Sequence, residues 1–250
     1  MKIVIIGGGA AGPKVALKAK RENPDLDVVL ITEEEYTSYS GCGLPYYIGG
    51  LINGTESVII KSPEQLRYEF GLKVLTGCRV VKIEHDNKIV QVSDLLQNKY
   101  LNIEYDRLVI ATGASPVIPN SLRCESNNFF TLRSVSDAFK IKEYIEKNNV
   151  QHVSIIGGSF IGLELAENIK KLGKQVSIIE LSEQLVPSFD RDFGDIIKNY
   201  VVENGISVFT GESATGFEFS EGKRLIKRII TDKRVISTDL IVLSVGVRPN

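Results

Sequence analysis

The chain has 250 residues, of which 43% are hydrophobic and 24% are charged, and its formal net charge is −1 at pH 7. This length allows two hydrophobic cores, and a nearly neutral chain lacks the basic field with which general nucleic-acid binders attract phosphate. The longest apolar runs, such as 28–31 and 240–243, are too short to span a bilayer. Two histidines and three cysteines at unrelated spacings give little basis for a metal site. With no signal-peptide pattern, we expect reduced thiols and a cytoplasmic location.

The first motif is a glycine-rich run after a short apolar stretch. Residues 2–6 lead into Gly7-Gly8-Gly9-Ala10-Ala11-Gly12 and then into an Ala- and Lys-rich stretch typical of a helix. This fits the G-x-G-x-x-G pattern, in which glycines let backbone amides approach a pyrophosphate and the helix N-terminus adds partial positive charge. A merely tight strand-to-helix turn is the alternative. The predicted dinucleotide contacts are Gly7, Gly9, Ala10, Ala11 and Gly12.

The motif recurs once, because residues 2–9 correspond to residues 152–159. The second copy is Gly157-Gly158-Ser159-Phe160-Ile161-Gly162, and its serine is small enough to let a phosphate approach. Two such β-α-β openings predict two nucleotide-binding domains. The predicted contacts of the second are Gly157, Ser159, Phe160, Ile161 and Gly162.

The remaining pattern predicts an α/β protein with two Rossmann-like three-layer nucleotide-binding domains, each with a small antiparallel β-meander. Strand-like runs flank Asp86-Asn87, and another pair flanks Glu221-Gly222, as in hairpins. The polar stretch 114–128, which contains two prolines, is typical of an exposed linker. The predicted boundaries are 1–115 for the first domain, 116–133 for the linker, 134–245 for the second domain and 246–250 for a closing segment.

Acidic residues follow the second strand of each unit. Glu180 ends one such strand, and no Lys or Arg occurs in 181–186. A carboxylate there accepts from a free 2′-hydroxyl and repels a 2′-phosphate, which favours NADH over NADPH. In the first unit Thr32 stands where an acid is usual, so Glu33 is the candidate for the ribose hydroxyls, unless it belongs to a solvated acidic turn. Glu164 is a candidate to face the nicotinamide, or a charge that favours the helix dipole.

Cys42 lies in a glycine-rich run, Ser40-Gly41-Cys42-Gly43-Leu44-Pro45, and Tyr47 stands five residues later. There is thus no Cys-x4-Cys pair of the kind that dithiol flavoenzymes use. Proline is typical of a first helical turn, and a helix N-terminus stabilises a thiolate, which makes the sulfur a nucleophile. Taken alone, such a cysteine is more often an inert small hydrophobe.

Three cations lie on one face of the first predicted helix. Lys14, Lys18 and Arg21 follow each other at i, i+4 and i+7. Such a stripe could hold the phosphates of a bulky anionic substrate, whereas ordinary solvated charge is the alternative.

These motifs together resemble the FAD- and NAD(P)H-dependent pyridine nucleotide-disulfide oxidoreductases. The resemblance also uses Ala111-Thr112-Gly113 after an apolar run and Gly246-Val247-Arg248-Pro249-Asn250 at the end. The run from Ser38 to Tyr46 resembles the single-cysteine branch, which includes coenzyme A disulfide, persulfide and polysulfide reductases, NADH oxidases and NADH peroxidases. The resemblance implies FAD and NADH as cofactors and adds the cofactor contacts Val80, Ala111, Thr112, Gly113 and Gly246.

Within that branch, NADH peroxidases and related oxidases carry a histidine in the first glycine loop, where this chain has Ala10. The resemblance therefore favours a reductase of coenzyme A disulfide or of per- or polysulfides, with Cys42 as the catalytic residue. Positions that contact coenzyme A in that family match Lys14, Lys18, Arg21 and Ser38. The asparagine that is often found beside the cysteine is replaced by Gly41 here. The alternatives are an NADH oxidase or peroxidase and a non-catalytic nucleotide-binding or redox-sensing module.

The resemblance also implies a longer protein. The family continues past the 246–250 motif, completes its FAD domain and adds a dimerisation domain. We therefore expect this chain to be the amino-terminal part of a homodimeric enzyme, with an incomplete FAD domain and weak or absent FAD binding on its own.

Overall fold

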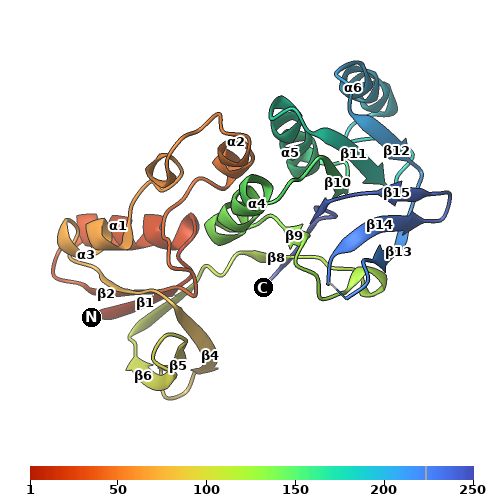
Figure 1. Ribbon diagram of the computed structural model, residues 1–250. Coiled ribbons are helices and arrows are strands. Elements are labelled where there is room, and N and C mark those ends of the chain that lie inside the picture. The colour runs from red at the N-terminus through yellow and green to blue at the C-terminus, as the bar shows by residue number, and fades with distance from the viewer. Residues whose placement is uncertain (223) are drawn as a thin grey trace. The chain divides into compact units, whose positions relative to one another are not determined.

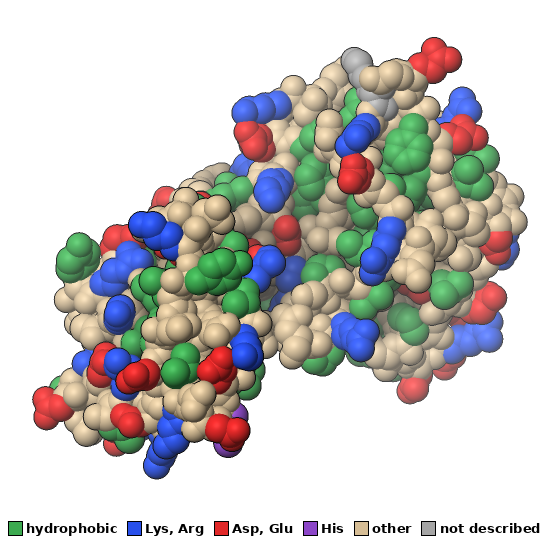
Figure 2. Space-filling view, turned by 90° about the horizontal axis from the view of Figure 1, so that it is seen from below, with side chains coloured by type: hydrophobic (Ala, Val, Ile, Leu, Met, Phe, Trp, Pro, Cys, Tyr) green, Lys and Arg blue, Asp and Glu red, His purple; other side chains and the backbone are tan. Residues whose placement is uncertain are grey.

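The computed structural model describes residues 1–222 and 224–250, which form two compact units (Figure 1). Unit 1 comprises Met1–Gly41, Gly54–Ala114 and Pro249–Asn250, and unit 2 comprises Cys42–Asn53 and Ser115–Arg248. Among the described residues, no helix has both the length and the apolar character that crossing a membrane requires. Figure 2 shows acidic and basic side chains interspersed over the face in view, in keeping with the small net charge.

Unit 1 is built on a four-stranded parallel sheet of order β3-β2-β1-β7. Its strands are β1 (Lys2–Ile6), β2 (Asp27–Ile31), β3 (Lys73–Leu75) and β7 (Arg107–Ile110). A separate antiparallel meander contains β4 (Cys78–Glu84), β5 (Ile89–Asp94) and β6 (Lys99–Glu104). The helices are α1 (Ala11–Glu22), which precedes β2, and α3 (Pro63–Tyr68), which follows the 3-10 turn η2 (Thr55–Ser57).

Alternation along the parallel strands gives unit 1 its three layers, because successive side chains point to opposite faces. Ile5, Val28 and Leu30 pack with Ala16 of α1 and Leu66 of α3. Their neighbours on the other face, among them Val4, Ile6, Val29 and Ile31, pack with Val90 and Val92 of the meander. Figure 1 accordingly shows the helices above the sheet and the meander below it.

Unit 2 repeats this plan on a five-stranded parallel sheet of order β12-β11-β10-β16-β9. The strands are β9 (Phe129–Thr131), β10 (His152–Ile156), β11 (Gln175–Glu180), β12 (Ser207–Thr210) and β16 (Leu240–Leu243). The helices are α4 (Val135–Lys147), α5 (Phe160–Lys171), α6 (Arg191–Glu203) and the short α2 (Leu44–Ile48), which follows the 3-10 turn η1 (Gly41–Gly43). The second meander contains β13 (Ala214–Phe219), β14 (Ile226–Thr231) and β15 (Val235–Ser237).

A buried cluster joins this meander to the sheet, with Ile156, Ile179 and Ile241 packed against Ile226 and Ile229. The predicted α/β class, the two Rossmann-like units and both meanders are thus confirmed. The two remaining strands, β8 (Ala114–Pro116) and β17 (Val247–Pro249), form a two-stranded sheet.

The stretch expected to be an exposed linker is partly buried. Leu122, in the 3-10 turn η3 (Asn120–Leu122), joins the core of unit 2. Asn128 is 1% exposed, and its side-chain amide donates to the carbonyls of Ile226 and Asp239, both at 2.8 Å. Its Oδ1 accepts from the Ile226 N–H at 2.9 Å. A polar residue within a polar run therefore belongs to the core, because its hydrogen bonds are all satisfied there.

Candidate functional site

Both glycine-rich loops have the backbone geometry that only glycine supports. Gly7 and Gly157 have φ values of +117° and +110°, a region that side chains other than glycine rarely occupy. A Cβ on Gly12 would stand 1.9 Å from the Gly7 carbonyl oxygen, and one on Gly162 would stand 2.1 Å from that of Gly157. The predicted strand–turn–helix context of each motif is therefore present, with the helix packed closely onto its own loop.

The first turns of α1 and α5 leave backbone amides for a ligand. Within the described chain, the N-cap residues Ala10 and Ser159 make no side-chain cap hydrogen bond. The first turn of a helix has N–H groups without partners inside the helix, and these groups bind phosphate well. The two loops thus fit the pyrophosphate of a dinucleotide.

The strand-end acid of unit 2 is held in place by its own loop. Glu180 is buried, and its carboxylate accepts from the Gly158 N–H at 2.6 Å and from the Ser182 N–H at 2.8 Å. These bonds fix the carboxylate beside the glycine loop, where the adenosine ribose of a dinucleotide lies in this fold. The following residue, Leu181, is exposed. Residues 181–186 contain no Lys or Arg, so this segment offers no positive charge to a 2′-phosphate.

The corresponding position of unit 1 is Thr32. Ile6 pairs with Ile31 and Ile156 with Ile179, so Thr32 and Glu180 each follow the equivalent strand residue. Thr32 is buried against Gly8. Glu33, the predicted ribose acid, accepts two hydrogen bonds from the Arg79 guanidinium, and this bonding holds the pKa of its carboxyl below the usual range. Sequence reasoning missed Arg79, because β4 is distant from Glu33 in the chain.

The internal repeat extends further than the sequence indicated. Ser38 and Val186 each lie six residues after Thr32 and Glu180, and both have left-handed φ values, +47° and +48°. The Ser38 N–H donates to the Gly8 carbonyl at 2.8 Å, and the Val186 N–H donates to the Gly158 carbonyl at 2.9 Å. In each unit the loop after the second strand is therefore fastened to the glycine loop in the same way.

The cysteine segment packs within unit 2. Cys42 is exposed in η1, and α2, which follows it, contacts α4 and α5. Lys142 of α4 donates to the Tyr47 carbonyl at 3.1 Å, and its ammonium lies 4.3 Å from the centre of the Tyr47 ring. Gly49 approaches α5 so closely that a Cβ would stand 2.6 Å from that of Asn168. The segment that carries Cys42 is therefore held in place by the packing of α2 on α4 and α5.

The other two cysteines differ from Cys42. Cys78 is buried and Cys124 is partly buried. Burial raises the pKa of both thiols, and for Cys78 the nearby Asp94 raises it further. At neutral pH, a smaller fraction of each of these two thiols is therefore ionised to the reactive thiolate than in an ordinary solvent-exposed cysteine.

The remaining predicted residues have varied settings. Lys14, Lys18 and Arg21 are exposed on α1, and Lys18 pairs with Glu22 at 2.5 Å. Asn250 donates to the Thr112 carbonyl at 2.9 Å and to the Gly113 carbonyl at 3.1 Å. The other positions are described by their surroundings: Val80 packs against the unit 1 core, the Ala111 carbonyl lies beside Gly7, Phe160 and Ile161 are exposed, Glu164 is half-buried, and Gly246 has a φ of +112°.

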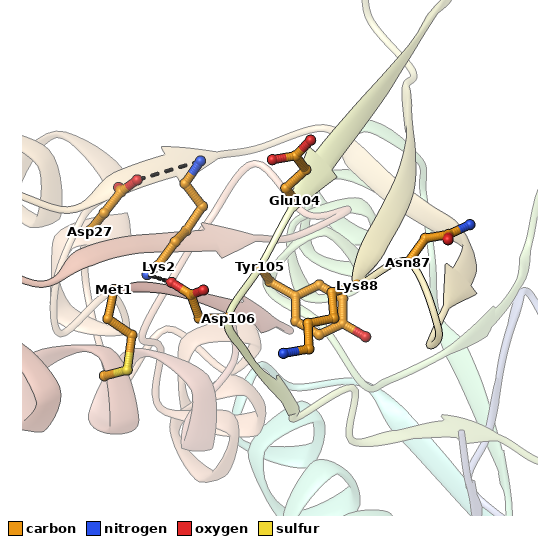
Figure 3. Close-up of a pocket in the computed structure, with 8 residues that line it drawn as sticks. All are labelled: Met1, Lys2, Asp27, Asn87, Lys88, Glu104, Tyr105 and Asp106. Atoms are coloured by element: carbon orange, nitrogen blue, oxygen red, sulfur yellow. Dashed lines mark hydrogen bonds and ion pairs between the residues drawn. The ribbon is translucent and has the colours of Figure 1, made fainter.

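A pocket of about 460 Å³ lies elsewhere in unit 1 (Figure 3). It is lined by Lys2 and Asp27 at the starts of β1 and β2, and by Lys88, Tyr105 and Asp106 of the meander region. The Lys2 ammonium forms an ion pair with Asp27 at 3.6 Å, and the Lys2 backbone N–H donates to the Asp106 carboxylate at 2.6 Å. The pocket is at the opposite end of the sheet from the glycine loop, and none of the predicted site residues lines it.

The fold and the two glycine loops define a protein with two Rossmann-type units. All 250 residues match the family model described as pyridine nucleotide-disulphide oxidoreductase, and the chain belongs to this family. It is 33% identical to an NADH oxidase of Methanocaldococcus jannaschii over 251 residues, covering 100% of this chain and 55% of that protein. It is 35% identical to a CoA-dependent NAD(P)H sulfur oxidoreductase of Pyrococcus abyssi, covering 99% and 54%.

Among solved structures, an NAD-dependent persulfide reductase from A. fulgidus matches with a TM-score of 0.93 at 31% identity, covering 100% of this chain and 46% of that chain. The predicted family is thus confirmed. The chain spans about half the length of these relatives.

Proposed function

We propose that this chain is the nucleotide-binding part of an FAD- and NADH-dependent reductase of coenzyme A disulfide or of per- or polysulfides. The observation that carries the proposal is the combination of two dinucleotide loops with one exposed cysteine, while burial raises the pKa of the thiols of Cys78 and Cys124. Relatives named as a CoA-dependent sulfur oxidoreductase and a persulfide reductase support it.

Each cofactor has its own set of residues in the proposal. The loop 7–12, Glu33, Val80 and 111–113 would hold FAD, and the loop 157–162 with Glu180 would hold NADH. Bound FAD would take hydride from NADH and supply electrons for sulfur reduction. The buried Glu180, fastened to Gly158 and Ser182, supports a free 2′-hydroxyl and hence NADH.

Cys42 acts as the nucleophile. Its thiolate attacks one sulfur of coenzyme A disulfide, an S–S bond forms between Cys42 and that sulfur, and the other half leaves as a thiolate that takes up a proton. Lys14, Lys18, Arg21 and Ser38 are the proposed contacts of coenzyme A. Cleavage of the Cys42–coenzyme A disulfide then needs two electrons, which bound FAD would supply, and one proton; it releases the second coenzyme A as a thiol and returns Cys42 to the thiolate.

The test is mass spectrometry of the non-reduced protein after incubation with coenzyme A disulfide. We expect a coenzyme A adduct on Cys42 in the natural chain and in Cys124→Ser, and no adduct in Cys42→Ser. An adduct that persists in Cys42→Ser would refute the assignment of Cys42. This step does not need FAD, so it can be measured on the 250-residue chain.

A second candidate is an NADH oxidase, which the relative of that name from Methanocaldococcus jannaschii favours. Ala10, in place of a histidine in the first glycine loop, counts against it. A sulfenic or sulfinic acid on Cys42 after exposure to NADH, FAD and oxygen would favour the oxidase. Binding of NADH with neither a coenzyme A adduct nor an oxidised sulfur on Cys42 would favour a non-catalytic nucleotide-binding or redox-sensing module.

A further inference from the structure

Glu212 is a buried carboxylate that the proposed reaction does not use. It follows β12, is 1% exposed, accepts a hydrogen bond from the Thr231 hydroxyl at 2.6 Å and forms an ion pair with Arg234, whose Nε lies 3.0 Å from the carboxylate. The Arg234 guanidinium also lies over the Phe209 ring, 4.6 Å from its centre. A buried charge is tolerated when it is paired and hydrogen-bonded, as this one is.

The loop that carries Glu212 is bonded to the loop that carries Glu180. The Glu212 N–H donates to the Glu180 carbonyl at 3.0 Å, and the Gly211 N–H donates to the Ser182 carbonyl at 2.8 Å. The Glu180 carboxylate in turn accepts from the Ser182 and Gly158 amides. Within unit 2, the loop that Glu212 anchors through Thr231 and Arg234 is therefore hydrogen-bonded along its backbone to the loop that carries the predicted ribose acid.

We infer that Glu212 and Arg234 are positioning residues for Glu180 and so help to set the preference for a 2′-hydroxyl over a 2′-phosphate. This inference rests on the proposed function, in which Glu180 binds the ribose of NADH. Glu180 discriminates only while its carboxylate is held toward the ribose, because both the hydrogen bond to a hydroxyl and the repulsion of a phosphate depend on that position. The contacts of the buried Glu212 carboxylate with Thr231 and Arg234 anchor the neighbouring loop and so keep the Glu180 carboxylate in place.

The test compares the dissociation constants of NADH and NADPH, measured by nicotinamide fluorescence on the 250-residue chain. The variant Glu212→Gln with Arg234→Met removes both charges, so neither is left buried and unpaired. We expect the NADH dissociation constant to rise about tenfold, the loss of one charge-assisted hydrogen bond, while the NADPH constant stays the same or falls, because the repulsion of the 2′-phosphate weakens. The preference for NADH then falls at least about tenfold.

An exposed pair on the same meander provides the control. Glu218 and Arg228 are bonded at 3.0 Å on β13 and β14 but have no bond to the Glu180 loop among those the structure records. Glu218→Gln with Arg228→Met makes the same change of charge and should leave the preference unaltered. An unchanged preference in the Glu212 variant, or an equal rise of both constants, would overturn the inference.

A third variant separates this inference from the proposed function. Glu180→Ala should lower the preference for NADH at least as strongly as the Glu212 variant. If Glu180→Ala leaves the preference intact, or if the natural chain binds neither nucleotide, the assignment of the NADH site is wrong and the inference falls with it. If Glu180→Ala lowers the preference for NADH and the Glu212 variant does not, only the inference about Glu212 and Arg234 is wrong.

Discussion

At the residue scale, burial separates three chemically identical thiols. Cys42 is exposed next to α2, whereas Cys78 lies in the core between the first sheet and its meander. Burial raises the pKa of the Cys78 and Cys124 thiols, and the thiolate is the form that attacks disulfides. The environment therefore selects which cysteine meets a substrate.

We predict that iodoacetamide alkylates Cys42 of the native protein at least about tenfold faster than Cys78 at pH 7. The raised pKa means that the Cys78 and Cys124 rates should still be climbing as the pH increases toward 9. Peptide mass spectrometry after timed quenching gives each rate, and the unfolded protein in urea serves as the control in which the three rates converge. Equal rates for Cys42 and Cys78 in the native state would contradict the prediction.

Glu33 and Arg79 form a pair that is about half exposed, with side-chain exposures of 49% and 57%. Arg79 lowers the pKa of the Glu33 carboxyl, so the pair stabilises the fold above the unfolded-state pKa of Glu33 and loses this effect as the pH falls through the folded-state value. Solvent screening keeps the contribution small. Arg79→Ala should lower the free energy of unfolding by about 1 kcal/mol or less at pH 7.

The difference between Arg79→Ala and the natural chain should vanish as the pH falls from about 5 through the folded-state pKa. Urea denaturation at several pH values measures it. Lys147→Ala, which removes the exposed ion pair of Lys147 with Glu143 on α4, serves as the control for the effect of losing one surface cation. A loss that grows with acidity would show that Arg79 acts through something other than Glu33.

At the scale of elements, the two sheets differ at one edge. β16 pairs with β9 in unit 2, whereas its counterpart β7 ends the sheet of unit 1. Ile110 and Leu243 occupy equivalent positions, since each lies opposite the last residue of its first strand, Ile6 or Ile156. Ile110 is 63% exposed and Leu243 is 2% exposed.

This difference predicts unequal effects of one substitution. Leu243→Ala should cost about 2–4 kcal/mol, because it removes a buried side chain and leaves a cavity, whereas Ile110→Ala should cost less than about 1 kcal/mol. Urea denaturation of each variant measures both, with circular dichroism to confirm the native fold. Equal costs would mean that β7 is covered in solution.

The elements that sequence reasoning predicted best are local ones. Each fingerprint carries its own strand end, glycine turn and helix start within a dozen residues, and both hairpins have a turn signal between their strands. The exposed linker was wrong for Leu122 and Asn128, because their burial depends on β14 and β16, which follow about a hundred residues later in the chain and leave no signal in the local composition.

At the scale of the whole molecule, each unit has its own glycine loop and its own fastening of the following loop. We therefore predict that NADH slows amide hydrogen exchange at 157–162 and 180–186 and leaves 7–12 unchanged, since ligand binding stabilises the structure that it contacts. Exchange measured by mass spectrometry with and without NADH tests this, and NADPH at the same concentration is the control expected to protect less. Protection at 7–12 in place of 157–162 would reverse the assignment of the two loops.

The amino-acid sequence by itself determined the two glycine loops and the class of fold, because their signals lie within short segments where glycine, proline and apolar spacing act directly on the backbone. It made Cys42 a candidate only through the resemblance to a family. Tertiary structure decided the rest. The packing of the Cys42 segment on α4 and α5, the pairing of Glu33 with Arg79 and the anchoring of Glu212 by Arg234 all join residues that are far apart in the chain. Such contacts depend on which strands and helices pack together, and no local pattern of residues encodes that.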